Sequence, residues 1–131
     1  LSTVQGWSNI NLTLIGPSAQ SSWNGLSNSN AIVGQAGHIS SAAALCLNST
    51  NGGQSDWYLP SIQELNMLWN NYYTVARSLT QISGATQLST AAYWSSTESD
   101  SDDAWYFYFV DGNAGNGYKS NASYVRAVRA F

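Results

Sequence analysis

Ala104-Trp-Tyr-Phe-Tyr-Phe-Val110 is the stretch that decides the fold of this chain. Successive side chains of a β-strand point to opposite faces, which gives the segment one face for a core and one for solvent. The two faces are Trp105, Phe107 and Phe109 on one side, and Tyr106, Tyr108 and Val110 on the other. A row of Tyr on an outer face suits recognition, because Tyr offers an apolar ring with a polar tip and few torsions to freeze. The alternative is purely structural, since tyrosines populate strands well.

The sequence predicts two helices upstream of this strand. The first lies within residues 37–48, where Ser40 or Ser41 can cap it, residues 42–47 are good helix formers, and Leu45 and Ile39 are expected on the buried side. The second begins after Ser61, because Ser61 and Glu64 have the spacing of a capping box and apolar residues follow at helical spacing. This second helical pattern can continue until Gly84 ends it.

Strand patterns lie on both sides of the helices. Residues 10–14 alternate apolar and polar side chains before Gly16-Pro17, which predicts a short strand, and residues 57–59 are extended before a proline. Further strands are expected at 93–96, at 104–110, around Tyr118 and at 124–131, with a turn at Asp111-Gly112. The order predicts an α+β fold with a C-terminal antiparallel sheet, and the length fits one domain over residues 1–131.

The predicted core is rich in aromatic residues. All six tryptophans are expected to pack on it: Trp7, Trp23, Trp57, Trp69, Trp94 and Trp105. Cys46 has no partner for an internal disulfide and lies in the Ala-rich segment, so we interpret it as a small buried hydrophobe.

Charged residues are scarce, at 8% of the chain against roughly 25% in an average soluble domain, and the net charge is -3. The cations are Arg77, Lys119, Arg126 and Arg129. A nucleic-acid binder needs several phosphate contacts from a basic face, so we expect no nucleic-acid partner. No apolar run approaches the roughly 20 residues that span a membrane, so membrane insertion is not expected. The chain opens on Leu1 without a signal peptide, which we interpret as the C-terminal fragment of a longer protein.

Five short motifs carry a resemblance to a known family. They are Asp56-Trp-Tyr-Leu-Pro-Ser61, Glu64-Leu65, Tyr93-Trp-Ser-Ser-Thr-Glu98, Ala104-Trp105 and Val125-Arg-Ala-Val-Arg129. Together they resemble the C-terminal domain family of the Legionella collagen-like adhesin (Lcl). The resemblance implies a fold similar to C-type lectins and to the formylglycine-generating enzymes.

The same resemblance implies an extracellular or bacterial cell-surface binding module. In the Lcl case this module is trimeric below a collagen-like stalk and binds sulfated glycosaminoglycans of the host. Members of the same fold also serve as hypervariable proteins that bind protein receptors, and the Ser-, Asn- and Tyr-rich segment 95–124 fits that use. The acidic, Lys-poor composition departs from what a heparin binder needs.

Catalysis is not expected. A nucleophile needs a base within hydrogen-bond reach, and the single histidine, His38, precedes Cys46 by eight residues, or about 12 Å along a helix. The formylglycine-generating enzymes depend on more than one cysteine, so their activity is not carried over. His38 is interpreted as a local capping or hydrogen-bonding residue, and no cofactor is predicted.

Calcium is the one ion that the sequence suggests, as a weak alternative. Five of the seven carboxylates lie between Glu98 and Asp111, and the candidates among them are Asp100, Asp102, Asp103 and Asp111. Ca²⁺ takes roughly six to eight oxygen ligands, and C-type lectins often bind sugar through such an ion. The spacing matches no EF-hand loop, and acidic runs usually form solvated loops.

The cations form one hypothetical binding surface. Lys119 and Arg77 are expected to be the most accessible, and Arg126 or Arg129 can join them when a homotrimer pools its charges. The alternative is that both strand arginines pack on Trp or Tyr faces, or pair with Glu64 or Glu98.

An uncharged surface is the second hypothesis for binding, and it serves a glycan or a protein receptor equally well. Its residues are Tyr106, Tyr108, Tyr118, Asn113, Asn116 and Asn121. Such groups stack on rings and hydrogen-bond to hydroxyls or amides.

Overall fold

The computed structural model describes residues 3–130. Its elements are β1 (Val4–Gly6), η1 (Pro17–Ala19), α1 (Gly25–Val33), α2 (Ala42–Leu47), η2 (Asn51–Gly53), α3 (Ile62–Asn70), α4 (Tyr72–Thr80), β2 (Ala92–Glu98), β3 (Asp103–Tyr108), β4 (Asn113–Tyr118) and β5 (Ala122–Tyr124), where η marks a 3-10 helix. The helices accompany a five-stranded, mostly antiparallel sheet, so the predicted α+β class is confirmed.

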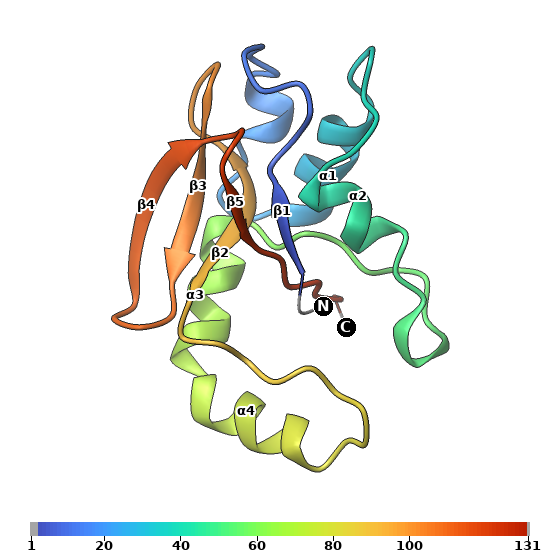
Figure 1. The fold of residues 1–131 in the computed structure, drawn as a ribbon, viewed down its shortest axis with the longest axis vertical. Coiled ribbons are helices and arrows are strands. Elements are labelled where there is room, and N and C mark those ends of the chain that lie inside the picture. The colour runs from blue at the N-terminus through green and yellow to red at the C-terminus, as the bar shows by residue number, and fades with distance from the viewer. Residues whose placement is uncertain (1–2, 131) are drawn as a thin grey trace.

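The sheet has the strand order β1-β5-β2-β3-β4 (Figure 1). Neighbouring strands are antiparallel except β2 and β5, which are parallel and share the single residue pair Tyr93 and Tyr124. β3 and β4 pair continuously, from Asp103 opposite Tyr118 to Tyr108 opposite Asn113. The sheet therefore combines a regular β3–β4 hairpin with a short contact between β2 and β5.

A tight turn joins β3 to β4, as predicted at Asp111-Gly112. Gly112 has a φ of 77°, in the left-handed region where a side chain is disfavoured. An added Cβ there would also clash with the Trp69 indole at Nε1, so this position lacks room for a side chain as well. The turn is fixed by backbone conformation and by packing against α3.

Two clusters of buried side chains hold the layers together. One lies between the sheet and α3, and contains Leu65, Tyr93, Phe107 and Phe109, with Trp69 packed against it. The other joins α1 and α2 to β2, and its buried members are Trp7, Ala19, Ile32, Ala42, Ala43, Cys46, Leu59, Trp94, Ala104 and Val125. β3 contributes Phe107 to the first cluster and Ala104 to the second, with Tyr106 packed beside Ala104. Both faces of this strand therefore meet a core, whereas its sequence predicted one core face and one solvent face.

The capping predictions are confirmed at α2 and α3. Ser41 Oγ accepts a 3.0 Å hydrogen bond from Ala44 N, and Ser61 and Glu64 form the full capping box. The second predicted helix is interrupted at Asn71, which ends α3 and precedes α4. The apolar pattern that predicted one helix therefore covers two helices, α3 and α4, which are separated at Asn71.

The sequence pattern did not predict the helix α1. α1 is capped by Asn24, whose side chain accepts a 2.9 Å hydrogen bond from Ser27 N. Its buried face includes the polar residues Asn28 and Ser29, so no apolar periodicity marks it. Asn28 instead hydrogen-bonds to Ser21, and Ser29 Oγ donates to Leu59 O, which satisfies these buried polar groups.

Two of the predicted strands are wrong. Residues 10–14 form no strand, because the following backbone turns to hydrogen-bond to the carboxylate of Glu98. Of the strand predicted over 124–131, Tyr124 alone belongs to β5, and Phe131 lies outside the described residues. After Tyr124, Val125 N donates to Thr3 O and Val128 bridges Tyr58. These contacts draw the two ends of the described chain together (Figure 1).

Two predictions of buried side chains are also wrong. Trp23 is 68% exposed and Ile39 is 84% exposed, and both lie in loops outside the helices and strands. Trp7 and Trp94 are fully buried as predicted, and their indole N–H groups donate to Ser95 O and Gln5 O. Cys46 is buried as well.

Candidate functional site

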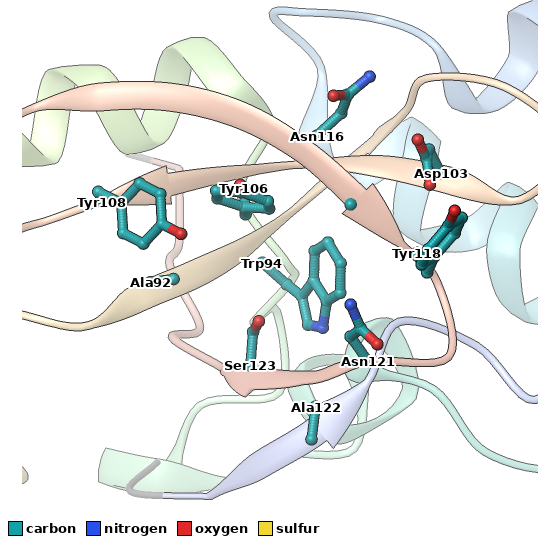
Figure 2. Close-up of a pocket in the computed structure, with 11 residues that line it drawn as sticks. Ala92, Trp94, Asp103, Tyr106, Tyr108, Asn116, Tyr118, Asn121, Ala122 and Ser123 are labelled. Atoms are coloured by element: carbon teal, nitrogen blue, oxygen red, sulfur yellow. The ribbon is translucent and has the colours of Figure 1, made fainter.

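A groove on the sheet gathers most of the predicted uncharged recognition surface. We call it the Tyr–Asn groove; its volume is about 630 Å³. Its lining comes from β2, β3, β4, β5 and the turn before β5: Ala92, Trp94, Asp103, Tyr106, Tyr108, Asn116, Gly117, Tyr118, Asn121, Ala122 and Ser123 (Figure 2). Five of the six predicted Tyr and Asn residues are present, and Asn113 alone of that set is not.

The aromatic part of the groove is a row of three rings in contact, which come from β2 and β3. Trp94 and Tyr106 face each other in the register of β2 and β3, with ring centroids 6.0 Å apart and nearly perpendicular rings. Tyr106 contacts Tyr108 in the same way at 4.9 Å. Trp94 was predicted only as a core residue, but its pairing with Tyr106 also makes it part of the groove.

Glycines on β4 make room for Tyr106. A Cβ added at Gly115 would lie 2.9 Å from the Tyr106 ring, and one at Gly117 would lie 3.1 Å from it. The two glycines are two residues apart on β4 and so lie on the same face of the sheet. Gly115 pairs with Tyr106, and Gly117 pairs with Ala104. The Tyr106 ring can therefore lie flat against β4. The Gly-x-Gly spacing is a signal that sequence reasoning missed.

Polar groups line the open side of the groove. Tyr108 and Tyr118 are 40% and 60% exposed, so their rings remain accessible to a ligand. A hydrogen bond with the Tyr108 side chain, together with burial, raises the pKa of Tyr106, which keeps its hydroxyl protonated at neutral pH. Asn116 Nδ2 donates to Ser99 Oγ over 3.1 Å, which orients this amide. The groove thus offers hydroxyls, amides and ring faces at one place.

The prediction that Lys119 is an accessible cation is wrong. Its side chain is fully buried, and Nζ lies 2.8 Å from Glu98 Oε1. Nζ also donates to Ser101 O at 2.9 Å and Thr13 O at 3.3 Å, and it lies 5.0 Å from the centre of the Trp7 ring. This ammonium holds the interior together, and in this conformation it is closed to a ligand.

Glu98 completes the buried ion pair from the other side. Its carboxylate accepts 2.8 Å hydrogen bonds from the backbone N–H groups of Ile15 and Gly16, and a longer one from Gln20 Nε2. The ion pair therefore joins the end of β2, the end of β4 and the segment that precedes η1. Sequence reasoning considered Glu98 only as a partner for a strand arginine and as one of the clustered carboxylates.

Arg129 pairs with a carboxylate, as the structural alternative anticipated, but the partner is Asp56. Both nitrogens of its fork are used: Nε lies 2.6 Å from Oδ1 and Nη2 lies 2.9 Å from Oδ2. Its guanidinium carbon is 5.8 Å from the centre of the Trp57 ring. Hydrogen bonding to Arg129 lowers the pKa of Asp56.

The other two arginines lie outside the Tyr–Asn groove. Arg126 is half-buried and donates from Nη1 to Thr86 O over 2.7 Å, and burial lowers its pKa. Arg77 is exposed in the last turn of α4, so its predicted accessibility is confirmed. The four cations are thus spread over separate parts of the molecule.

Three of the calcium candidates lie close together. One carboxylate oxygen from each of Asp100, Asp102 and Asp103 falls within 4.8 Å of the others. Asp100 Oδ1 already accepts from the backbone N–H groups of Asp102 and Asp103, at 3.1 Å and 2.9 Å. Asp111 is not in this group, and its carboxylate accepts from Asn113 N. Three carboxylates alone fall short of the roughly six to eight oxygens that Ca²⁺ takes.

His38 and Cys46 have separate structural roles. His38 Nε2 is 2.8 Å from Ser41 Oγ, the cap of α2, as expected for a local hydrogen-bonding residue. Cys46 is buried in the core, and desolvation raises the pKa of its thiol to about 12. A thiol with so high a pKa is protonated at neutral pH and is a poor nucleophile.

Comparison with known proteins agrees with the resemblance carried by the sequence motifs. The model of the family described as the Lcl C-terminal domain matches residues 7–129, while no curated protein sequence matches the chain. Within residues 3–130, the helices are all too short or too polar to cross a bilayer. Because the family model covers almost the whole chain, this chain belongs to the Lcl C-terminal domain family and is an adhesin-related domain.

Proposed function

We propose that this chain is an extracellular adhesion domain of a bacterial surface protein and that it binds host glycans in the Tyr–Asn groove. The observation that carries the proposal is the convergence of ring faces, hydroxyls and amides from four strands in one groove. Sugars present both C–H faces and hydroxyl groups, and such a lining complements both.

The charges near the groove favour an uncharged stretch of glycan over a sulfated one. Asp103 lines the groove, with Asp100 and Asp102 beside it, while the ammonium of Lys119 is buried against Glu98. A polyanion brought to this surface meets like charge. The ligand we assign to the groove is therefore a neutral oligosaccharide segment.

Sulfated glycosaminoglycans are the second candidate ligand, at a different surface. Arg77 is exposed on α4, and a homotrimer would bring three copies of it together. Weak single sites would then combine into useful avidity. This arrangement depends on the trimer, so it predicts that binding is lost when subunits are separated.

Binding of a protein receptor is a candidate from another class. The exposed rings of Tyr108 and Tyr118 would serve a polypeptide ligand as well as a sugar. A receptor interface extends beyond one groove, since stable interfaces usually bury about 800 Å² on each partner. Binding to an immobilised polypeptide but to no sugar would favour this reading.

A glycan array probed at two salt concentrations tests these proposals together. Neutral glycan binding through rings and amides should barely change with ionic strength, whereas polyanion binding should fall steeply. Tyr108→Ala and Asn116→Ala should each weaken binding roughly tenfold, which corresponds to about 1.4 kcal/mol. Tyr73→Ala is the matched control, because Tyr73 is 76% exposed on α4 and lines no part of the groove.

Two results would overturn the proposal. One is an array in which the protein binds only sulfated glycans and loses them in salt. The other is neutral-glycan binding that survives both groove substitutions at full strength. The oligomeric state, measured in parallel by light scattering, would decide whether avidity contributes.

A further inference from the structure

A second pocket lies at the end of α4, and we call it the Arg126 pocket. Its volume is about 460 Å³, and it shares no lining residue with the Tyr–Asn groove. Trp57, Leu79 and Ile82 give it an apolar side, and Arg126 lies among the lining residues with backbone of the loop that follows α4. The pocket is thus mainly apolar with one cationic group.

Arg126 differs from Lys119 and Arg129 in its charge partners. Lys119 and Arg129 each have a carboxylate within 3 Å. Arg126 is half-buried, and within residues 3–130 no carboxylate pairs with it. Among the residues that the structure describes, its side chain makes one hydrogen bond, from Nη1 to Thr86 O, and the Tyr93 hydroxyl is the titratable group that interacts with it electrostatically.

A guanidinium that has lost part of its hydration and has no counterion favours an anion. Arg presents N–H donors in a planar fork that matches a carboxylate, so the remaining donors of Arg126 suit that group. The loop carbonyl of Thr86 already occupies Nη1, which limits the space for a large, multiply charged group. A single carboxylate on a compact skeleton fits this surrounding best.

We propose that the Arg126 pocket binds the carboxyl terminus of a peptide whose last residue has an apolar side chain. The carboxylate pairs with Arg126, and the side chain packs between Trp57, Leu79 and Ile82. Capture of a terminal carboxylate is an established mode of peptide recognition. This site is independent of the Tyr–Asn groove, so either proposal can fail without the other.

An NMR titration of the whole domain tests the proposal with N-acetyl-leucine as the probe. The probe should shift the indole N–H signal of Trp57 and the side-chain Nε–H signal of Arg126. N-acetyl-leucinamide, which lacks only the charge, should bind roughly tenfold to a hundredfold more weakly. Glucuronate carries a carboxylate on a polar ring, and it should also bind more weakly than N-acetyl-leucine.

Arg126→Gln should abolish the response, and Arg77→Gln is the matched control that removes the same charge from the exposed face of α4. Ser83→Trp keeps Arg126 and places a large side chain at the exposed rim of the pocket, so it should weaken binding of N-acetyl-leucine. This variant tests the site even where Arg126→Gln fails to fold. Equal binding of acid and amide would overturn the proposal. So would tighter binding of glucuronate, or a shift that survives in Arg126→Gln.

Discussion

Replacing Lys119 by Met tests the view that the fold depends on one buried ion pair. The substitution keeps an unbranched side chain that is one heavy atom shorter, and it removes the charge. The Glu98 side chain, which is fully buried, then stays in the interior without its cation. Breaking a buried pair in this way typically costs about 3–5 kcal/mol, because an uncompensated charge is left behind.

The structure places the expected loss at the lower end of that range. Glu98 keeps its hydrogen bonds from Ile15 N, Gly16 N and Gln20 Nε2, and these offset part of the missing charge. We therefore expect a loss of about 3 kcal/mol in the free energy of unfolding, or a fall in melting temperature on the order of 10 °C.

Urea denaturation followed by tryptophan fluorescence measures the effect. The double variant Lys119→Met with Glu98→Gln should lose less than the sum of the two single variants, since it removes both charges together. Arg129→Met breaks the exposed pair with Asp56 and should cost much less. A loss from Lys119→Met as small as that from Arg129→Met would refute the reasoning.

Three further predictions concern the strands and loops around the Tyr–Asn groove. Gly115→Val should displace the Tyr106 ring, lower stability by about 1–3 kcal/mol and weaken glycan binding, as thermal melts and the glycan array would show. Hydrogen bonds from the backbone of Asp103, and then from that of Asp102, lower the pKa of Asp100 below its usual 3.8. The ionised Asp100 carboxylate therefore stabilises the fold at a pH above the unfolded-state pKa. This stabilisation is lost as the pH falls through the lower folded-state pKa. Asp100→Asn should therefore flatten the loss of stability below about pH 4 in melts across a pH series. Adding Ca²⁺ should leave the melting temperature unchanged, and an upward shift at millimolar Ca²⁺ would contradict our account of this acidic group.

Local signals in the sequence were sufficient wherever one residue pattern determined the structure. The alternation in 104–110 predicted a strand that contributes to the core, and Ser61 with Glu64 predicted the start of α3. Tyr106, Tyr108 and Tyr118 were correctly grouped, because the hairpin turn at Gly112 brings neighbouring strands together. Short-range patterning thus gave the hairpin and most of the groove.

Long-range contacts account for what the sequence did not reveal. Lys119 follows a glycine-rich strand and looks exposed, yet its partner Glu98 and its acceptor Thr13 come from distant segments. The helix α1 is hidden for a similar reason, since Asn28 and Ser29 on its buried face find partners elsewhere in the chain. A buried polar residue cannot be recognised from sequence until the group that satisfies it is known.

The position of β4 at the margin of the sheet has a consequence for solubility. Within the described part of the chain this strand is hydrogen-bonded to β3 alone, so its outer backbone groups could template a strand from another molecule. Its sequence, Asn-Ala-Gly-Asn-Gly-Tyr, contains no β-branched residue and is a weak template for such growth. The glycines that make room for Tyr106 therefore also disfavour edge-to-edge aggregation. Bulkier residues in β4 would increase the tendency of the domain to aggregate and would displace its ligand contacts.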